Sequence, residues 1–141
     1  MTVPDSIRKR VRQQAKFRCG YCRVEEQRVY APMEVEHIQP IAIGGADDEE
    51  NLWLACPWCN TYKGTKTHSF DPLSEQHVSL FNPRQQNWSE HFERDEDRAT
   101  ILGLTPCGRA TVIAFRFNES HVLELRRGFV RVGWYPPEDE R

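Results

Sequence analysis

The 141-residue sequence contains no long run of apolar residues, and its first residues lack an apolar stretch. A membrane-spanning helix needs about 18 or more such residues, and a secretory signal needs an apolar core, so neither is predicted. Internal repeats and low-complexity tracts are also absent. With 38% apolar and 28% charged residues, the composition predicts a cytoplasmic globular protein without a membrane partner. The length fits one domain, or one small core with an appendage.

The sequence has little net charge, because 19 basic residues oppose 21 acidic ones, but these charges are unevenly distributed. Residues 1–30 carry a net charge of +5, and residues 31–70 carry a net charge of −4. A basic arm beside an acidic, metal-attracting segment suits a protein that cuts a polyanion. The alternative is that the basic residues only solvate the surface of a helix.

Four of the five cysteines form two Cys-x-x-Cys pairs, which are Cys19/Cys22 and Cys56/Cys59. In a reducing compartment such pairs are typical of structural zinc sites with four thiolate ligands. Two redox dithiols or a disulfide are the alternatives. We expect Gly20 to give the first pair the conformational freedom of a tight turn. The remaining cysteine, Cys107, is expected to be a small buried apolar residue.

The distance between the two pairs indicates how a shared zinc would act. Thirty-three residues separate Cys22 from Cys56, whereas a simple zinc ribbon has about 15–20. A zinc bound by both pairs would therefore close a loop around a complete supersecondary unit. It would also fix the N-terminal helix to the start of the helix that follows Cys56.

Periodicity and turn residues predict a strand–loop–strand–helix order in the centre of the chain. Apolar residues at four-residue spacing favour a helix near the N-terminus, and Pro57 suits the first turn of a later helix. The elements expected here are a helix over residues 5–17, a strand over 33–39 extended past Pro40 by 41–43, a loop over 44–48, a strand over 52–55 and a helix from Pro57.

The composition changes after Lys66, where prolines and glutamines predict irregular structure. Thr105 followed by Pro106 is typical of a helix N-terminus. The elements expected in this part are a strand over residues 88–93 paired with 101–102, a helix from Pro106 to about Phe115, a helix capped by Asn118 and reaching Val132, and a frayed acidic tail.

The stretch from residue 34 to residue 66 contains side chains suited to phosphodiester hydrolysis. This reaction needs a base to activate water and a cation to stabilise developing negative charge. His37 can be the base, because imidazole accepts a proton near pH 7. Glu36 and Asn60 offer a carboxylate and an amide oxygen of the kind that Mg²⁺ or Mn²⁺ binds, and Glu34 is a rival ligand. Neighbouring strand residues point to opposite faces, so Glu36 and His37 can serve one phosphate only where the strand twists or ends.

The order of these residues resembles the motif of the HNH endonucleases. The motif elements are Glu36-His37, Gly44-Gly45, Asn51, Cys56-x-x-Cys59-Asn60 and Lys63. The resemblance covers residues 19–66 and implies a small ββα-metal (His-Me finger) core. It implies that His37 is the general base and that Asn51 braces the loop and orients His37.

The resemblance also implies the ligands of a catalytic ion. Glu36 and Asn60 correspond to the metal-binding positions, and Lys63 corresponds to a lysine suited to a phosphate. Glu36 replaces the more frequent Asp, and Asn60 stands where the family has either His or Asn. These two residues leave the choice between Mg²⁺ and Mn²⁺ open.

These features together predict an α+β protein that acts as a metal-dependent DNA endonuclease. It would consist of a basic N-terminal helix (1–18), an HNH core with structural Zn²⁺ (19–66) and a mixed extension packed on that core (67–141). The basic residues expected to bind DNA are Arg8, Arg12, Lys16 and Lys66. One site cuts one strand, so double-strand cleavage would require a homodimer or two encounters. The alternatives are a non-catalytic zinc-containing nucleic-acid-binding module and a redox protein.

Overall fold

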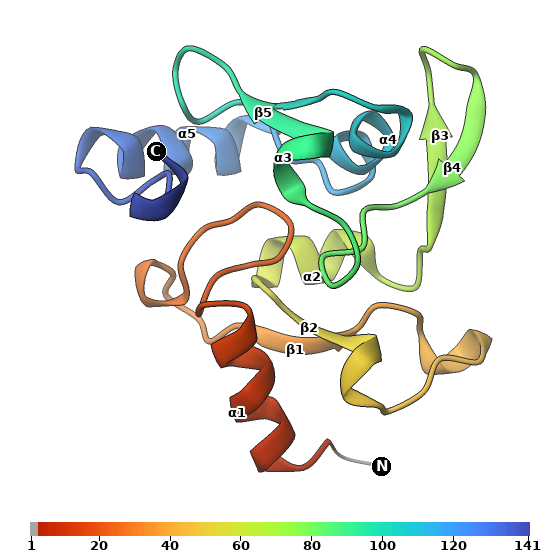
Figure 1. The fold of residues 1–141 in the computed structure, drawn as a ribbon. Helices are drawn as coiled ribbons and strands as arrows, with labels where there is room; N and C mark the ends of the chain where they lie inside the picture. Colours follow the sequence, from red (N-terminus) through yellow and green to blue (C-terminus); the bar gives the residue numbers. More distant parts are fainter. Residues whose placement is uncertain (1–2) are drawn as a thin grey trace.

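The computed structural model describes residues 3–141, which form an α+β structure with three separate two-stranded antiparallel sheets (Figure 1). The helices are α1 (Asp5–Gln14), α2 (Pro57–Lys63), α3 (Trp88–His91), α4 (Pro106–Ala114) and α5 (Ser120–Arg131). The strands are β1 (Glu34–His37), β2 (Leu52–Ala55), β3 (His68–Asp71), β4 (Gln76–Ser79), β5 (Phe92–Arg94) and β6 (Ile101–Gly103). Within these described residues, no helix is long and apolar enough to cross a membrane.

Helix α1 ends one turn earlier than the sequence predicts. Val11 and Ala15 are buried, as their spacing indicates. However, Lys16 and Phe17 adopt positive φ angles of 55° and 56°, which are incompatible with a continuing right-handed helix. The chain therefore turns after Gln14 and enters the first cysteine pair.

Strands β1 and β2 pair antiparallel and are followed by α2, so the strand–loop–strand–helix order agrees with the prediction. The predicted strand extension over residues 41–43 is wrong, because this segment is a 3₁₀ turn. Pro40 precedes it and has no N–H group to continue a ladder. At the start of α2, the Sγ of Cys56 accepts a hydrogen bond from the amide of Cys59.

The segment after Lys66 is more regular than predicted, because β3 and β4 form a hairpin. The carboxylate of Asp71 accepts hydrogen bonds from the amides of Leu73 and Ser74, which closes the turn. Figure 1 shows this hairpin rising beside α4. Most of its side chains are exposed, so the hairpin lacks the apolar alternation by which strands are recognised in a sequence.

The predicted strand over residues 88–93 is only partly correct. Residues Trp88–His91 form the short helix α3, and the strand β5 begins at Phe92. Its predicted antiparallel pairing with residues 101–102 is confirmed, with Glu93 opposite Leu102.

The N-terminal cap of α4 agrees with the prediction, and that of α5 does not. Thr105 caps α4 as predicted, since its hydroxyl accepts a hydrogen bond from the amide of Gly108. The predicted Asn118 cap of α5 is wrong, because its side chain instead bonds the amide and the carbonyl of Ile101. Glu119 caps α5 instead, because its side chain accepts a hydrogen bond from the amide of His121. The helix ends at Arg131, one residue before the predicted Val132, whose side chain is exposed.

The acidic tail is ordered, which contradicts the predicted fraying. The carboxylate of Glu140 lies within 2.6 to 3.0 Å of the guanidinium groups of Arg18, Arg23 and Arg94. Tyr135 is buried before this tail, and its hydroxyl donates to the carbonyl of Cys22. The tail is therefore bonded to the segment that carries the first cysteine pair.

One buried cluster contains residues from both sides of Lys66. The rings of Tyr21 and Phe115 have centroids 4.6 Å apart, and the indole of Trp88 donates to the carbonyl of Tyr21. In Figure 1, α2 lies between α1, β1 and β2 on one side and α3, α4 and α5 on the other. Burying large apolar side chains contributes about 1.5–3 kcal/mol each, so the later segments help to hold the central unit in place.

Candidate functional site

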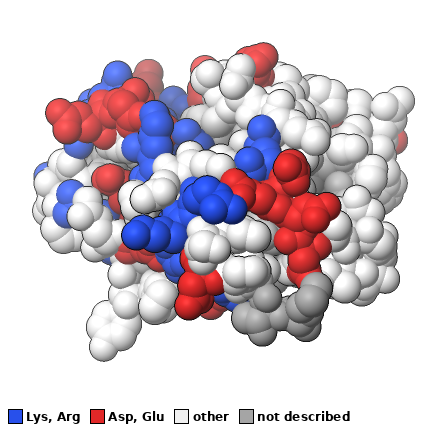
Figure 2. All heavy atoms as spheres, turned by 60° about the horizontal axis from the view of Figure 1, so that its bottom comes forward, with Lys and Arg blue, Asp and Glu red and all other residues white. Residues whose placement is uncertain are grey.

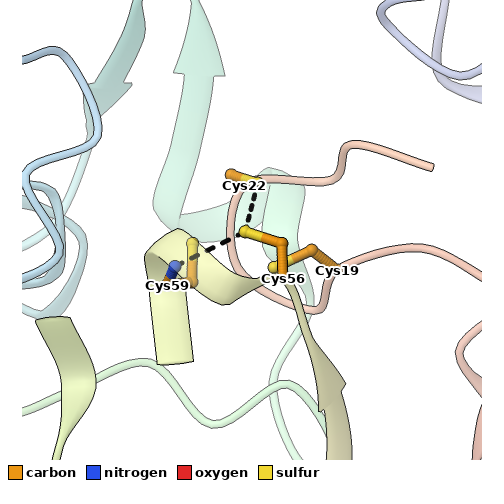
Figure 3. A group of neighbouring side chains, drawn as sticks. All are labelled: Cys19, Cys22, Cys56 and Cys59. Atoms are coloured by element: carbon orange, nitrogen blue, oxygen red, sulfur yellow. Dashed lines mark hydrogen bonds between the residues drawn. The ribbon is translucent and has the colours of Figure 1, made fainter. Parts of the chain in front are cut away.

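The four paired cysteines converge at the junction of the N-terminal segment, β2 and α2 (Figure 3). All four are buried, and their sulfur atoms lie within 4.8 Å of one another. The Sγ atoms of Cys22 and Cys56 are 3.7 Å apart. A tetrahedral zinc with bonds of about 2.3 Å separates its sulfur ligands by about 3.8 Å, so the cluster fits zinc. All cysteines are free, which contradicts the alternative of a disulfide.

The hydrogen bonds within the cluster favour the thiolate form of Cys19. Burial alone would raise the pKa of Cys19, but hydrogen bonds from Cys22, Cys56 and Cys59 lower this pKa well below its ordinary value. Hydrogen bonding to Cys19 raises the pKa of Cys56, and burial raises the pKa of Cys59, so a single thiolate is favoured in the metal-free cluster, whereas a structural zinc would bind all four cysteines as thiolates. The geometry therefore supports the zinc prediction independently of the sequence spacing.

Gly20 acts differently from the prediction. Its φ is not positive, so no unusual conformation requires a glycine there. Instead, a Cβ atom at this position would collide with the indole ring of Trp53 and with Pro83. The glycine therefore permits the first cysteine turn to approach β2 closely.

His37 lies at the end of β1, and its side chain faces the loop that connects β1 to β2. The Nε2 atom of His37 is 2.6 Å from Oδ1 of Asp47, and both side chains are about a quarter exposed. An ionised carboxylate only accepts hydrogen bonds, so this contact places the ring proton on Nε2. Asp47 was not among the predicted site residues, because a carboxylate in a polar glycine-rich loop has no distinctive sequence signal.

Asn51 connects the two ends of this loop through three hydrogen bonds. Its side-chain oxygen accepts from the amide of Gln39, and its NH₂ group donates to the carbonyls of Gln39 and Ala46. The last of these contacts is next to Asp47. Asn51 thus fixes the segment that carries the partner of His37.

Glu36 points away from His37 into the protein. Its Oε1 atom accepts a 2.6 Å hydrogen bond from the hydroxyl of Tyr21, and its Oε2 atom is 3.4 Å from Nζ of Lys63. Burial raises the pKa of Glu36, although Lys63 and Tyr21 act in the opposite direction. Lys63 also donates to the carbonyl of His37 at 3.1 Å. The structure therefore directs the Lys63 ammonium inward, whereas the sequence predicted a phosphate contact.

Asn60 lies on α2, one turn before Lys63, and is half-buried. Within residues 3–141, its side-chain amide has no hydrogen-bond partner and remains available to a ligand. The rival ligand Glu34 is exposed at the start of β1, whereas Glu36, two residues later in the same strand, is buried.

The basic residues of α1 do not form a surface of one sign. Arg10 lies 2.8 Å from Glu49, and Arg12 lies 3.4 Å from Glu26, whereas Arg8 donates to the carbonyl of Val3. Lys16, which follows α1, lies 3.3 Å from Asp139. On the face that contains α1, Figure 2 shows Lys and Arg side chains adjacent to Asp and Glu side chains. Acidic side chains of the same molecule therefore neutralise part of the predicted basic arm.

Lys66, the remaining residue expected to bind DNA, lies just after α2. It is exposed, and its ammonium donates to the carbonyl of Tyr62 at 2.9 Å. A carbonyl carries no negative charge, so the positive charge of Lys66 is not neutralised by this contact.

Comparison with known proteins gives one family match. Residues 19–66 match the model described as HNH endonuclease. This segment contains both cysteine pairs, His37, Asn51 and Asn60. No curated protein matches the chain, and no solved structure matches it. The family match favours nuclease chemistry, and the cysteine cluster favours zinc binding.

Proposed function

We propose that this protein is a metal-dependent DNA endonuclease in which His37 is the general base. The observation that carries this proposal is the 2.6 Å contact between His37 and Asp47 in a loop fixed by Asn51. It lies inside the segment that matches the HNH endonuclease model. A histidine held in one tautomer is an effective base, because its second ring nitrogen remains ready to accept a proton.

The contact with Asp47 assigns separate roles to the two ring nitrogens of His37. Nε2 donates to the carboxylate, so Nδ1 is the nitrogen that accepts the proton of a water molecule. As the water oxygen forms a bond to phosphorus, its proton passes to Nδ1. The bond between phosphorus and the leaving oxygen breaks, and this oxygen takes a proton from solvent. Asp47 acts as a positioning residue and stabilises the imidazolium that forms.

Glu36 and Asn60 are the residues proposed to hold a divalent ion, Mg²⁺ or Mn²⁺. The donor set fits such an ion, because the Oε2 atom of Glu36 has only the 3.4 Å contact with Lys63 and the Asn60 amide is free within the described residues. When bound, the ion would stabilise the charge on the phosphorane and the leaving oxygen. Lys63 would meanwhile keep the buried carboxylate neutralised and support the His37 carbonyl.

The second candidate is a non-catalytic zinc-containing nucleic-acid-binding module. It is favoured by the burial of Glu36, whose carboxylate already has Tyr21 and Lys63 as partners. The two candidates differ in one respect that can be measured. Only the nuclease requires a base at His37.

The decisive experiment is cleavage of supercoiled plasmid by protein that was treated with EDTA and retains zinc. After Mg²⁺ or Mn²⁺ is restored, the wild type is expected to nick the plasmid. His37→Ala should lower the rate by about 10²–10⁴-fold, because the positioned base is lost. His77→Ala is the matched control, since His77 is an exposed histidine on β4.

Zinc content and circular dichroism of both variants should equal those of the wild type. If the protein binds DNA but does not cleave it with either Mg²⁺ or Mn²⁺, the nuclease proposal is contradicted and the binding module is supported. Linear product that appears only at high protein concentration would indicate cleavage of both strands by two protomers.

A further inference from the structure

A groove of about 530 Å³ begins beside His37 and is not explained by the proposed chemistry. One wall consists of residues that follow His37, including Ile38 and Gln39. Lys63 and Lys66 lie at its base, and Ser79 and Gln85 belong to the opposite wall. The groove therefore lies between the central unit and the segment that follows the HNH match.

The groove is physically connected to the proposed catalytic centre. Lys63 lines it, and the ammonium of this residue donates to the carbonyl of His37 at 3.1 Å. Ile38, which follows His37 directly, is part of the same lining. A ligand in the groove would thus be next to the strand end that presents the base.

The lining has the chemistry of a nucleic-acid site. It includes several neutral amides and the exposed Lys66, and no carboxylate is among its residues. This is unusual for a chain in which acidic residues outnumber basic ones. Lys63 also lines the groove, but the charge of this residue is already balanced by Glu36 at 3.4 Å. The exposed side chain of Gln85 has no hydrogen-bond partner within the described residues. Glutamine amides can hydrogen-bond base edges, and lysines bind phosphate.

The far wall of the groove is held in place by contacts with the rest of the protein. Asp71 at the end of β3 forms two 3.0 Å hydrogen bonds with Arg109 of α4. The amide of Phe81 donates to Thr111, and Arg84 donates to the carbonyl of Leu52. A wall fixed in this way loses little conformational freedom when a ligand binds.

We propose that this groove binds a nucleotide or two of a single DNA strand beside the scissile phosphate, with Lys66 at a phosphate and Gln85 at a base. The inference rests on the proposed function for the position of that phosphate. The volume lies within the range of about 300–1,000 Å³ of small-molecule pockets, which suits one strand and not the width of a duplex. The segment after Lys66 thereby contributes directly to substrate binding.

The test changes the charge of the groove without removing any hydrogen bond within the described residues. Gln85→Glu and Gln85→Lys are compared with Gln76→Glu and Gln76→Lys, because Gln76 is an exposed glutamine on β4 that does not line the groove. Binding of a labelled single-stranded DNA of about 12 nucleotides is measured by fluorescence anisotropy. The protein is freed of divalent ions by EDTA and retains its zinc.

Gln85→Glu is expected to weaken binding by about three- to tenfold and Gln85→Lys to strengthen it by a similar factor, because one charge acts at short range on the backbone. The slope of log affinity against log salt should change by about 0.7 for each charge. The two Gln76 variants should each change affinity by less than about twofold, because the screened charge is more distant.

Equal effects at positions 85 and 76, or no effect at either position, would overturn the groove assignment. The Gln85 substitutions should change the affinity for a duplex of the same sequence less than they change the affinity for the single strand. A larger effect on the duplex would also contradict single-strand binding. Plasmid cleavage by the wild type is measured separately. If the wild type cleaves plasmid but the Gln85 variants bind single-stranded DNA as the wild type does, only the proposal for the groove is rejected. If the Gln85 variants change the affinity but the wild type does not cleave plasmid, only the nuclease proposal is rejected.

Discussion

At the scale of single residues, Glu36 and His37 are neighbours in sequence with opposite environments. Both residues belong to the antiparallel pairing of β1 with β2, in which Glu36 is paired with Trp53 and His37 with Leu52. Alternation along the strand therefore continues to its last residue. It directs Glu36 towards Lys63 in the interior and His37 towards Asp47 in the loop. The two side chains therefore have partners on opposite sides of β1.

The contact of His37 with Asp47 predicts a graded loss of activity. Asp47→Ala should lower kcat by about 10- to 100-fold with little change in KM, because the imidazole is no longer held in one tautomer. Asp47→Asn retains an oxygen acceptor and should recover part of that loss. Plasmid nicking rates and the ¹⁵N chemical shifts of the His37 ring are the measurements.

Asp48→Ala is the matched control for Asp47, because Asp48 is an exposed carboxylate in the same loop. Equal losses in Asp47→Ala and Asp48→Ala would indicate a general effect of loop charge. An unchanged tautomer in Asp47→Ala would show that another group orients the ring.

At the scale of elements, the β3–β4 hairpin depends on one ion pair. The side chain of Asp71 is fully buried, and the guanidinium of Arg109 on α4 faces both of its oxygens. The Arg109 guanidinium holds the pKa of Asp71 well below its usual range. A carboxyl group whose pKa is lowered on folding stabilises the native state above its unfolded pKa of about 3.9, and this contribution disappears as the pH falls through the acid range.

Asp71→Asn is therefore expected to lower the melting temperature by a few degrees at pH 7. The difference from the wild type should shrink as the pH decreases below about 4, because Asp71 of the unfolded chain then binds a proton while the native carboxylate stays ionised, which favours unfolding of the wild type. Thermal unfolding at several pH values measures this. Glu75→Gln, an exposed change in the same hairpin, should leave the melting temperature unaltered, and a pH-independent effect of Asp71→Asn would contradict the ion-pair explanation.

At the scale of the whole molecule, the cysteine cluster joins segments that are distant in sequence. Cys19 and Cys22 follow α1, Cys56 lies between β2 and α2, and Cys59 belongs to α2. The hydroxyl of Tyr135, near the C-terminus, bonds the carbonyl of Cys22. Loss of the metal would therefore disturb both ends of the chain.

Zinc is expected to bind with one ion per chain, and Cys19→Ser should lose both the metal and cooperative unfolding. Zinc binding in small zinc domains contributes about 10–16 kcal/mol, which is comparable to the entire stability of a typical domain. Elemental analysis and thermal unfolding are the measurements. Cys107→Ser is the control, because Cys107 lies outside the cluster and should keep zinc and stability. Full zinc content in Cys19→Ser would contradict the four-cysteine assignment.

The sequence by itself determined the features that depend on a few neighbouring residues. The cysteine pairs, the start of α2 at Pro57 and the Thr105 cap of α4 all follow from local backbone chemistry. A strand that contains His37 was predicted as well, although β1 ends at His37 and the predicted strand continued beyond it. Local hydrogen bonding and fixed backbone angles leave such segments few alternatives.

Only the tertiary structure decided which distant groups became partners. Glu140 lies with Arg18, and Lys16 lies with Asp139, although more than a hundred residues separate each pair. These contacts convert a predicted basic arm and a predicted frayed tail into neutralised, ordered surface. Long-range ion pairs and the burial of Glu36 arise from how the elements pack, and charge order along a chain carries no information about that packing.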